Sequence, residues 1–238
     1  MLDLKGNKIT YYGHSTLALT TKGGQVALID PWVMSNPLCP EALKETARLD
    51  AIFLTHGHSD HLGDMLALAR QFKPKIVATF ETYLWLESKK LGATCLPGNK
   101  GGTQKVGEFE VTMTNAFHSN SIEDEGKRIY AGEAGGFVVK LPGGVSVYHA
   151  GDTAAFGDMK LIGEIYKPDV ACLPIGDVFT MGPREAVHAI RLLGVKHVIP
   201  IHHSTFPMLT GTPEGLRAEA KDIAGLEIHT LKPGETLG

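Results

Sequence analysis

The stretch 56–61 constrains this chain more than any other part of its sequence. It reads H-x-H-x-D-H and places four side chains that can bind a transition metal within six residues. These four candidate ligands are His56, His58, Asp60 and His61. An apolar run at 51–54 precedes them, and an apolar run with helical character at 62–70 follows, so we expect a buried strand, a tight turn and a helix. Imidazoles and a carboxylate crowded on one turn are typical of a divalent metal site.

The composition of the chain is that of a soluble globular protein. Hydrophobic residues make up 43% of its 238 residues and charged residues 21%, and the net charge of -3 gives no reason to expect an obligatory nucleic-acid partner. No apolar run approaches the roughly 20 residues of a membrane span. Residues 1–8 lack the apolar core of a signal peptide. Three cysteines without a C-x-x-C spacing predict free thiols. We therefore expect a cytoplasmic protein with no membrane partner.

Short apolar runs bounded by glycine and proline predict strands throughout the chain, with helices between the later ones. The predicted strands are 9–12, 16–20, 26–29, 51–54, 75–79, 109–117, 136–141, 145–148, 169–174, 197–201 and 227–231. The predicted helices are 62–70, 81–91, 159–166, 183–193 and 213–223. We see no linker or repeat. This pattern favours one α/β domain over residues 1–238, built on two sheets with helices outside.

Further candidate ligands lie directly after predicted strands, as His56 does. They are His118, Asp152 and His202. Strand ends direct several chain segments into one crevice in layered α/β folds, so we expect these side chains to meet the turn. Seven ligands exceed the needs of one ion and suit two, which would share and activate a water. The expected first set is His56, His58 and His118, the second is Asp60, His61 and His202, and Asp152 bridges the two.

These motifs, in this order, resemble those of the metallo-β-lactamase superfamily, and the resemblance covers essentially the whole chain. Shorter phrases resemble a narrower branch of metal-dependent hydrolases akin to ascorbate-6-phosphate lactonase. They are Gly13-His14-Ser15, Asp30-Pro31, Pro174-Ile175-Gly176-Asp177 and Phe179-Thr180-Met181-Gly182-Pro183. The resemblance implies an αββα sandwich of two mixed β-sheets flanked by helices. It also implies a dinuclear site, usually with Zn²⁺ and sometimes with Mn²⁺ or Fe²⁺. It does not imply a substrate, because the superfamily cleaves lactams, lactones, thioesters and phosphodiesters.

The predicted function is hydrolysis of a small ester, lactone or phosphorylated metabolite by a hydroxide that two metal ions activate. Asp60 and Asp152 are the predicted catalytic residues that orient this nucleophile, and Asp60 could carry a proton to the leaving group. The main alternative is a phosphodiesterase that acts on RNA or a cyclic nucleotide. A di-iron redox protein is a further alternative, although His58 stands where that group typically has a carboxylate. A non-catalytic metal-binding protein is the last, and a homo-oligomer stays open.

Three residues are predicted substrate contacts. His14, between two strands, could contact substrate, donate a proton, bind metal or simply bond to the backbone of its turn. Asp177 lies in a loop before a predicted helix, whose free amides could hold an anion. His203 follows directly on His202, and strand alternation favours His202 as the metal ligand. His149 either supports the ligands or is a core histidine.

Overall fold

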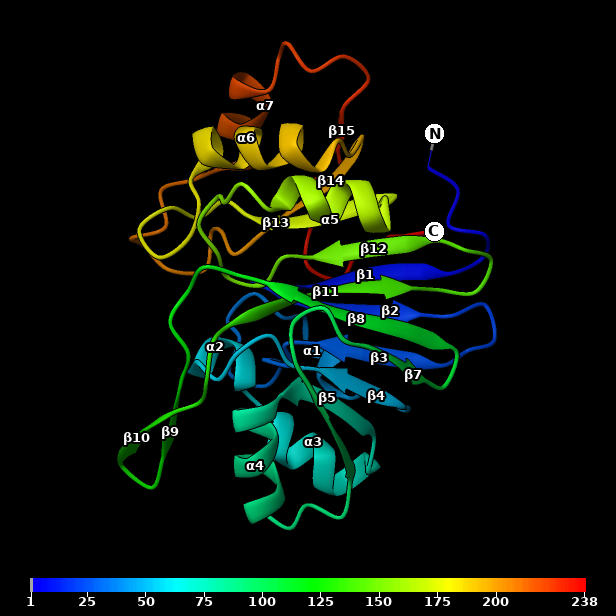
Figure 1. Cartoon of the computed structure of the whole chain (residues 1–238), viewed down its shortest axis with the longest axis vertical. Coiled ribbons are helices and arrows are strands. Elements are labelled where there is room, and N and C mark those ends of the chain that lie inside the picture. The colour runs from blue at the N-terminus through cyan, green and yellow to red at the C-terminus, as the bar shows by residue number, and fades with distance from the viewer. Residues whose placement is uncertain (1) are drawn as a thin grey trace.

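Two seven-stranded β-sheets lie face to face at the centre of the computed structural model, which describes residues 2–238 (Figure 1). The first sheet has the order β16-β1-β2-β3-β4-β5-β6. Its strands are β1 (Lys8–Gly13), β2 (Thr16–Thr20), β3 (Val26–Ile29), β4 (Ala51–Phe53), β5 (Lys75–Thr79), β6 (Thr94–Gly98) and β16 (Thr236–Leu237). Strands β3 to β6 run parallel to one another, and β1 to β3 are antiparallel. The sheet is therefore mixed, as expected.

The second sheet has the order β15-β14-β13-β12-β11-β8-β7 and is mixed in the same way. Its strands are β7 (Thr103–Val106), β8 (Phe109–Asn115), β11 (Gly135–Lys140), β12 (Ser146–His149), β13 (Val170–Pro174), β14 (His197–Ile201) and β15 (Glu227–Ile228). A separate hairpin of β9 (Ser121–Asp124) and β10 (Lys127–Tyr130) projects from the body between β8 and β11 (Figure 1).

Helices cover the outer faces of both sheets (Figure 1). On the first sheet lie α1 (Glu41–Lys44), α3 (Met65–Phe72) and α4 (Phe80–Ser88). On the second lie α5 (Met159–Tyr166), α6 (Pro183–Leu193) and α7 (Pro213–Glu219). In the part of the chain that is described, no helix combines the length and the apolar character that crossing a bilayer would require.

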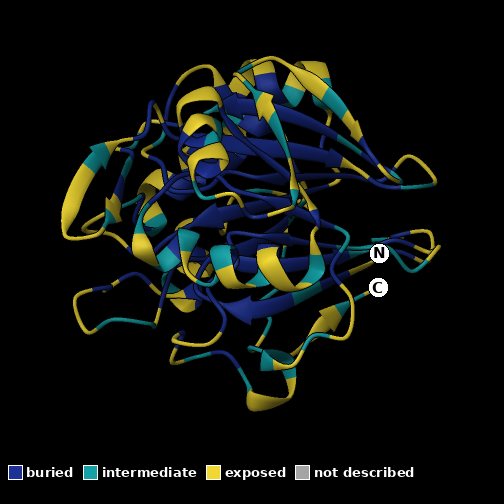
Figure 2. Cartoon of the chain, turned by 90° about the horizontal axis from the view of Figure 1, so that it is seen from below, coloured by how far each residue is buried: buried dark blue, intermediate teal, exposed yellow. Residues whose placement is uncertain are grey.

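The central strands of both sheets are buried on both faces, which explains why they read as continuous apolar runs (Figure 2). Between the sheets, Phe53, Phe109 and Phe137 pack edge to face or tilted at 5.8–5.9 Å between ring centroids. Alternate residues such as Ile52 point outward and pack under α3 and α4. The outer faces of the helices are exposed.

The helix predicted at 62–70 is divided in the structure. A four-residue helix, α2 (Ser59–Leu62), includes two of the candidate ligands and ends at Gly63, and α3 begins two residues later. Gly63 has a φ of 39°, and a Cβ there would overlap the Trp32 backbone. Close packing of the chain against Trp32 therefore breaks the helix. The Asp64 carboxylate accepts hydrogen bonds from the Val33 and Met34 amides and fixes the break.

The contact between α5 and α6 supplies a test of the packing outside the second sheet. A Cβ at Gly163 in α5 would overlap the Leu193 carbonyl of α6, so Gly163→Ala requires the two helices to separate. We expect the free energy of unfolding in urea to fall by about 1–3 kcal/mol, despite the better helix propensity of alanine. Gly157→Ala is the matched control, because no atom lies within 4 Å of the added methyl group. Equal stability of the two variants would contradict this packing.

Candidate metal centre

The ligand turn is held to the end of the neighbouring strand by Asp30. This buried residue follows β3, and its carboxylate accepts hydrogen bonds from the Thr55 amide (2.8 Å) and hydroxyl (2.6 Å). The Thr55 hydroxyl in turn lies 3.0 Å from His56 Nδ1. Because that hydroxyl already donates to Asp30, His56 Nδ1 donates to it, which leaves a lone pair on His56 Nε2.

The structure brings together the first expected ligand set. His56 Nε2 lies 3.0 Å from His58 Nδ1, and His118 Nε2 lies 3.3 Å from the same atom. Nitrogens bound tetrahedrally to one zinc ion would be about 3.3 Å apart, since Zn–N bonds are about 2.0–2.1 Å. Burial is the main reason that the pKa of each of the three imidazoles is lowered. Neutral rings with converging nitrogens fit a metal ion.

The second expected set also converges, and the His14 ring lies beside it. One ligand atom each from His14, Asp60, His61 and His202 lie within 4.8 Å of one another. Asp60 Oδ2 is 3.9 Å from His61 Nε2, 3.8 Å from His202 Nε2 and 3.0 Å from His14 Nε2.

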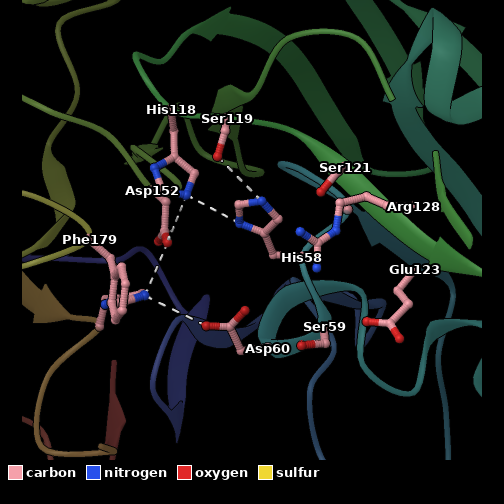
Figure 3. A pocket seen from close by; sticks show the side chains of 12 residues that line it. His58, Ser59, Asp60, His118, Ser119, Ser121, Glu123, Arg128, Asp152 and Phe179 are labelled. Carbon is pink, nitrogen blue, oxygen red and sulfur yellow. Dashed lines mark hydrogen bonds and ion pairs between the residues drawn. The ribbon is translucent and has the colours of Figure 1, made fainter. Parts of the chain in front are cut away.

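Asp152 lies close to ligands of both sets, and Figure 3 shows its side chain beside His118. Its Oδ2 atom is 3.0 Å from His202 Nε2 and 3.3 Å from His61 Nε2, and it is 3.6 Å from His118 Nε2. Its Oδ1 atom is buried and makes no hydrogen bond within the described structure. A carboxylate in this position faces ligands of both sets.

Three carboxylates surround the buried ring of His61. Its Nδ1 donates to Asp30 Oδ2 at 2.8 Å, while Nε2 faces Asp60 and Asp152 and makes no hydrogen bond among the described residues. Burial alone would lower the pKa of His61, but Asp152, Asp30 and Asp60 hold it well above its ordinary value. Three carboxylates around one buried ring, two of them buried themselves, require a positive charge, and the accompanying imidazole nitrogens fit a divalent metal ion.

Backbone contacts join the two sheets at this centre. The His14 carbonyl accepts hydrogen bonds from the His202 amide (2.8 Å) and the Tyr11 hydroxyl (3.1 Å). His14, Asp30 and His202 are buried and have φ angles of 50–57°, a region that non-glycine residues seldom adopt. Such strained residues cluster at functional sites, where surrounding contacts maintain them.

Two of the predicted substrate contacts lie away from the cleft. Asp177 is in an exposed loop, where its carboxylate accepts from its neighbour's amide, Val178 N, at 2.7 Å. The His203 ring lies near Tyr11, and its Nδ1 is 2.9 Å from Ser204 Oγ. Neither residue is among those that line the cleft, and their predicted roles stay predictions.

His149 occupies a structural position beside the ligands. Its Nε2 lies 2.9 Å from the Ser15 carbonyl, and its Nδ1 accepts from the Gly151 amide at 3.1 Å. Burial lowers the pKa of His149, and these two bonds define its neutral tautomer. The ring thus supports the backbone immediately before Asp152.

A cleft of about 340 Å³ opens onto the two ligand sets (Figure 3). Candidate ligands that line it are His58, Asp60, His118, Asp152 and His202, and its other walls are Gly57, Ser59, Ser119, Ser121, Glu123, Arg128 and Phe179. The sequence interpretation missed the hairpin residues, because this polar segment shows no apolar alternation. It also missed the role of Asp30, although Asp30 follows a strand end as the ligands do.

Comparison with known proteins agrees with this geometry. Residues 26–203 match the pattern of the β-lactamase superfamily domain. A metal-dependent hydrolase of Rubrobacter xylanophilus is 54% identical over 237 residues, which cover 99% of this chain and 98% of the relative. Igni18, a metallo hydrolase of Ignicoccus hospitalis, has a TM-score of 0.86 at 33% identity, with 97% of each chain covered. An isothiocyanate hydrolase from Delia radicum gut bacteria shares the fold, with a TM-score of 0.73 at 21% identity over 97% of this chain and 98% of that one.

The family match and the whole-length relatives confirm the predicted αββα fold and the predicted enzyme class. The chain belongs to the β-lactamase superfamily and is a metal-dependent hydrolase.

Proposed function

We propose that the chain holds two divalent metal ions and hydrolyses a small ester, lactone or phosphorylated metabolite. The position of Asp152 carries this proposal. Its Oδ2 atom lies within 3.6 Å of His118 in the first set and within 3.3 Å of His61 and His202 in the second. One carboxylate shared by two sets of ligands is the arrangement that a pair of ions requires.

Zinc is the metal that the donor atoms favour. The first set consists of three imidazole nitrogens, which suit zinc, and the second mixes nitrogen with carboxylate oxygen, which Mn²⁺ and Fe²⁺ also accept. When bound by these residues, such ions would lower the pKa of water and so would supply a nucleophile near neutral pH.

The surroundings of Asp60 support its proposed role in proton transfer. Burial alone would raise its pKa, but His61 and the hydrogen bond from His14 hold that pKa below its ordinary value. The ionised carboxylate accepts a hydrogen bond from His14 Nε2, so this nitrogen carries a proton and positions Asp60. Burial lowers the pKa of His14 to about 4, so the ring is neutral at pH 7. Asp60 lines the cleft with 24% of its side chain exposed, so its carboxylate is accessible to a bound substrate, as proton transfer requires.

The cleft supports a small-molecule substrate. Its volume of about 340 Å³ is at the lower end of the range for small-ligand sites. We further propose that the protein is cytoplasmic and has no obligatory nucleic-acid or membrane partner. The free thiols Cys39, Cys95 and Cys172 support a reducing compartment.

Replacement of the shared carboxylate tests the two-metal proposal. Asp152→Asn keeps the shape of the side chain but removes its charge, so we expect metal content to fall from two ions per chain and turnover to fall at least about 100-fold. Metal content is measured by elemental analysis, and turnover on a panel of lactones, esters and phosphodiesters.

Asp222→Asn is the control, because Asp222 is an exposed residue that pairs with Arg191 on the surface. Full turnover by a chelated, metal-free sample would rule out the mechanism. A wild-type chain with one tightly bound ion would rule out the paired arrangement.

The role of Asp30 is tested by metal affinity rather than by activity. Asp30→Asn leaves one carbonyl oxygen where a carboxylate accepts from Thr55 and His61, so the ring of His61 is less firmly oriented. We expect the affinity for metal to fall about 10–100-fold in competition with a chelator of known affinity. Glu164→Gln, on the exposed face of α5, serves as the control. Unchanged affinity in Asp30→Asn would show that Asp30 does not support the centre.

A further inference from the structure

One wall of the cleft is formed by the β9–β10 hairpin. Ser121, Glu123 and Arg128 all line the cleft, and in Figure 3 the guanidinium of Arg128 extends into it beside His58. Arg128 and Glu123 are directly opposite each other in the strand pairing. Side chains alternate along a strand, so Lys127 belongs to the other face of the hairpin, opposite Asp124.

The hairpin is firmly attached to the body at its base. Asn120 accepts a hydrogen bond from the Gly57 amide (2.8 Å) and donates one to the Ala131 carbonyl (2.7 Å). Ile122 is fully buried and packs so closely on the ligand turn that a Cβ at Gly57 would overlap its side chain. The first residues of the hairpin are thus in direct contact with the turn that carries the candidate metal ligands.

The far end of β9 is attached as well. The Asp124 carboxylate accepts from Trp85 Nε1 of α4 at 2.9 Å and pairs with Lys89, which directly follows that helix. The buried face of the hairpin is therefore occupied by contacts with the body, and its other face is available to the cleft. The backbone of Arg128, which pairs with β9, is thus held near one position relative to the metal centre.

Arg128 has no partner of its own within the described residues. It makes no ion pair or hydrogen bond there, even with Glu123 opposite, although neighbouring charged residues such as Asp124 and Lys89 are paired. Among the described residues that line the cleft, it is the single lysine or arginine. An unpaired guanidinium beside a reaction centre is suited to bind a carboxylate or phosphate through two parallel hydrogen bonds.

We propose that Arg128 binds an acidic group of the substrate, a carboxylate or phosphate, while the group to be hydrolysed lies at the metal ligands. This inference rests on the proposed function and narrows its substrate class to small anionic esters and lactones and to phosphorylated metabolites. One arginine suits a single small anion. A nucleic acid would need several cations along its backbone, and the cleft does not offer them. Hydroxyl groups of Ser119 and Ser121 line the same wall and can donate to the bound anion.

Binding of simple anions to metal-replete protein tests this proposal without turnover. Calorimetric titration uses a dicarboxylate series from succinate to adipate, 4-phosphonobutyrate, and butyrate as the probe without a second acidic group. We expect Arg128→Ala to weaken binding of the best diacid about 10-fold or more and to leave butyrate unaffected. Arg128→Lys, which keeps the charge but loses the planar fork, should be intermediate.

Lys127→Ala is the matched control, because it removes the same charge from the next residue of the hairpin on the opposite face. Wild-type affinity in this variant, with loss in Arg128→Ala, supports a local contact. Equal losses in both variants, no loss in either, or no preference of the wild type for diacids over butyrate would overturn the proposal. The phosphonate arm shows which acidic group is preferred. If anions bind in an Arg128-dependent way but no anionic ester is turned over, the binding proposal is supported and the proposed hydrolysis is contradicted.

Discussion

Charge neutralisation around His61 is the constraint on which the centre depends. Asp30, Asp60 and Asp152 come from different parts of the chain and converge on one buried ring. Their mutual repulsion in a site of low dielectric constant is too large to persist without a cation. Protonation of His61 supplies part of the positive charge that the three carboxylates require, and these carboxylates are the reason that its pKa is raised. A divalent metal ion would satisfy this requirement more fully, since the hydrogen bond from Nδ1 to Asp30 leaves Nε2 of His61 to serve as a ligand.

The fold delivers these groups to one edge because each follows the end of a strand. β3, β4, β12 and β14 lead into Asp30, His56, Asp152 and His202, respectively, so two sheets contribute to one crevice. The His14 carbonyl then joins the sheets through the His202 amide. Left-handed backbone at both of these residues turns their side chains inward, and the strain this involves is confined to the site.

Much of the fold and of the ligand set could be predicted from the sequence, for a physical reason. Strands buried on both faces give continuous apolar runs in the sequence, so the predicted bounds of β2, β3, β5 and β14 agree with the structure. A ligand that directly follows such a run takes its position from the end of that strand. The division at Gly63 depends on distant Trp32 and is not local information. The direction in which the His203 side chain points depends on the left-handed backbone of His202 and Ser204, and no sequence pattern indicates that conformation.

The hairpin was the least predictable element, and it forms the wall that we expect to select the substrate. Its strands pair mainly with each other, so they need no apolar alternation, and their few anchors, Asn120, Ile122 and Asp124, are scattered among charges. The metal ligands require a strict spacing, because a coordination sphere tolerates little displacement. The exposed residues of the hairpin can be substituted without disturbing the coordination sphere, provided that the anchor residues remain. The same fold can therefore serve hydrolases of different specificity, and differences between them should concentrate at positions such as Arg128.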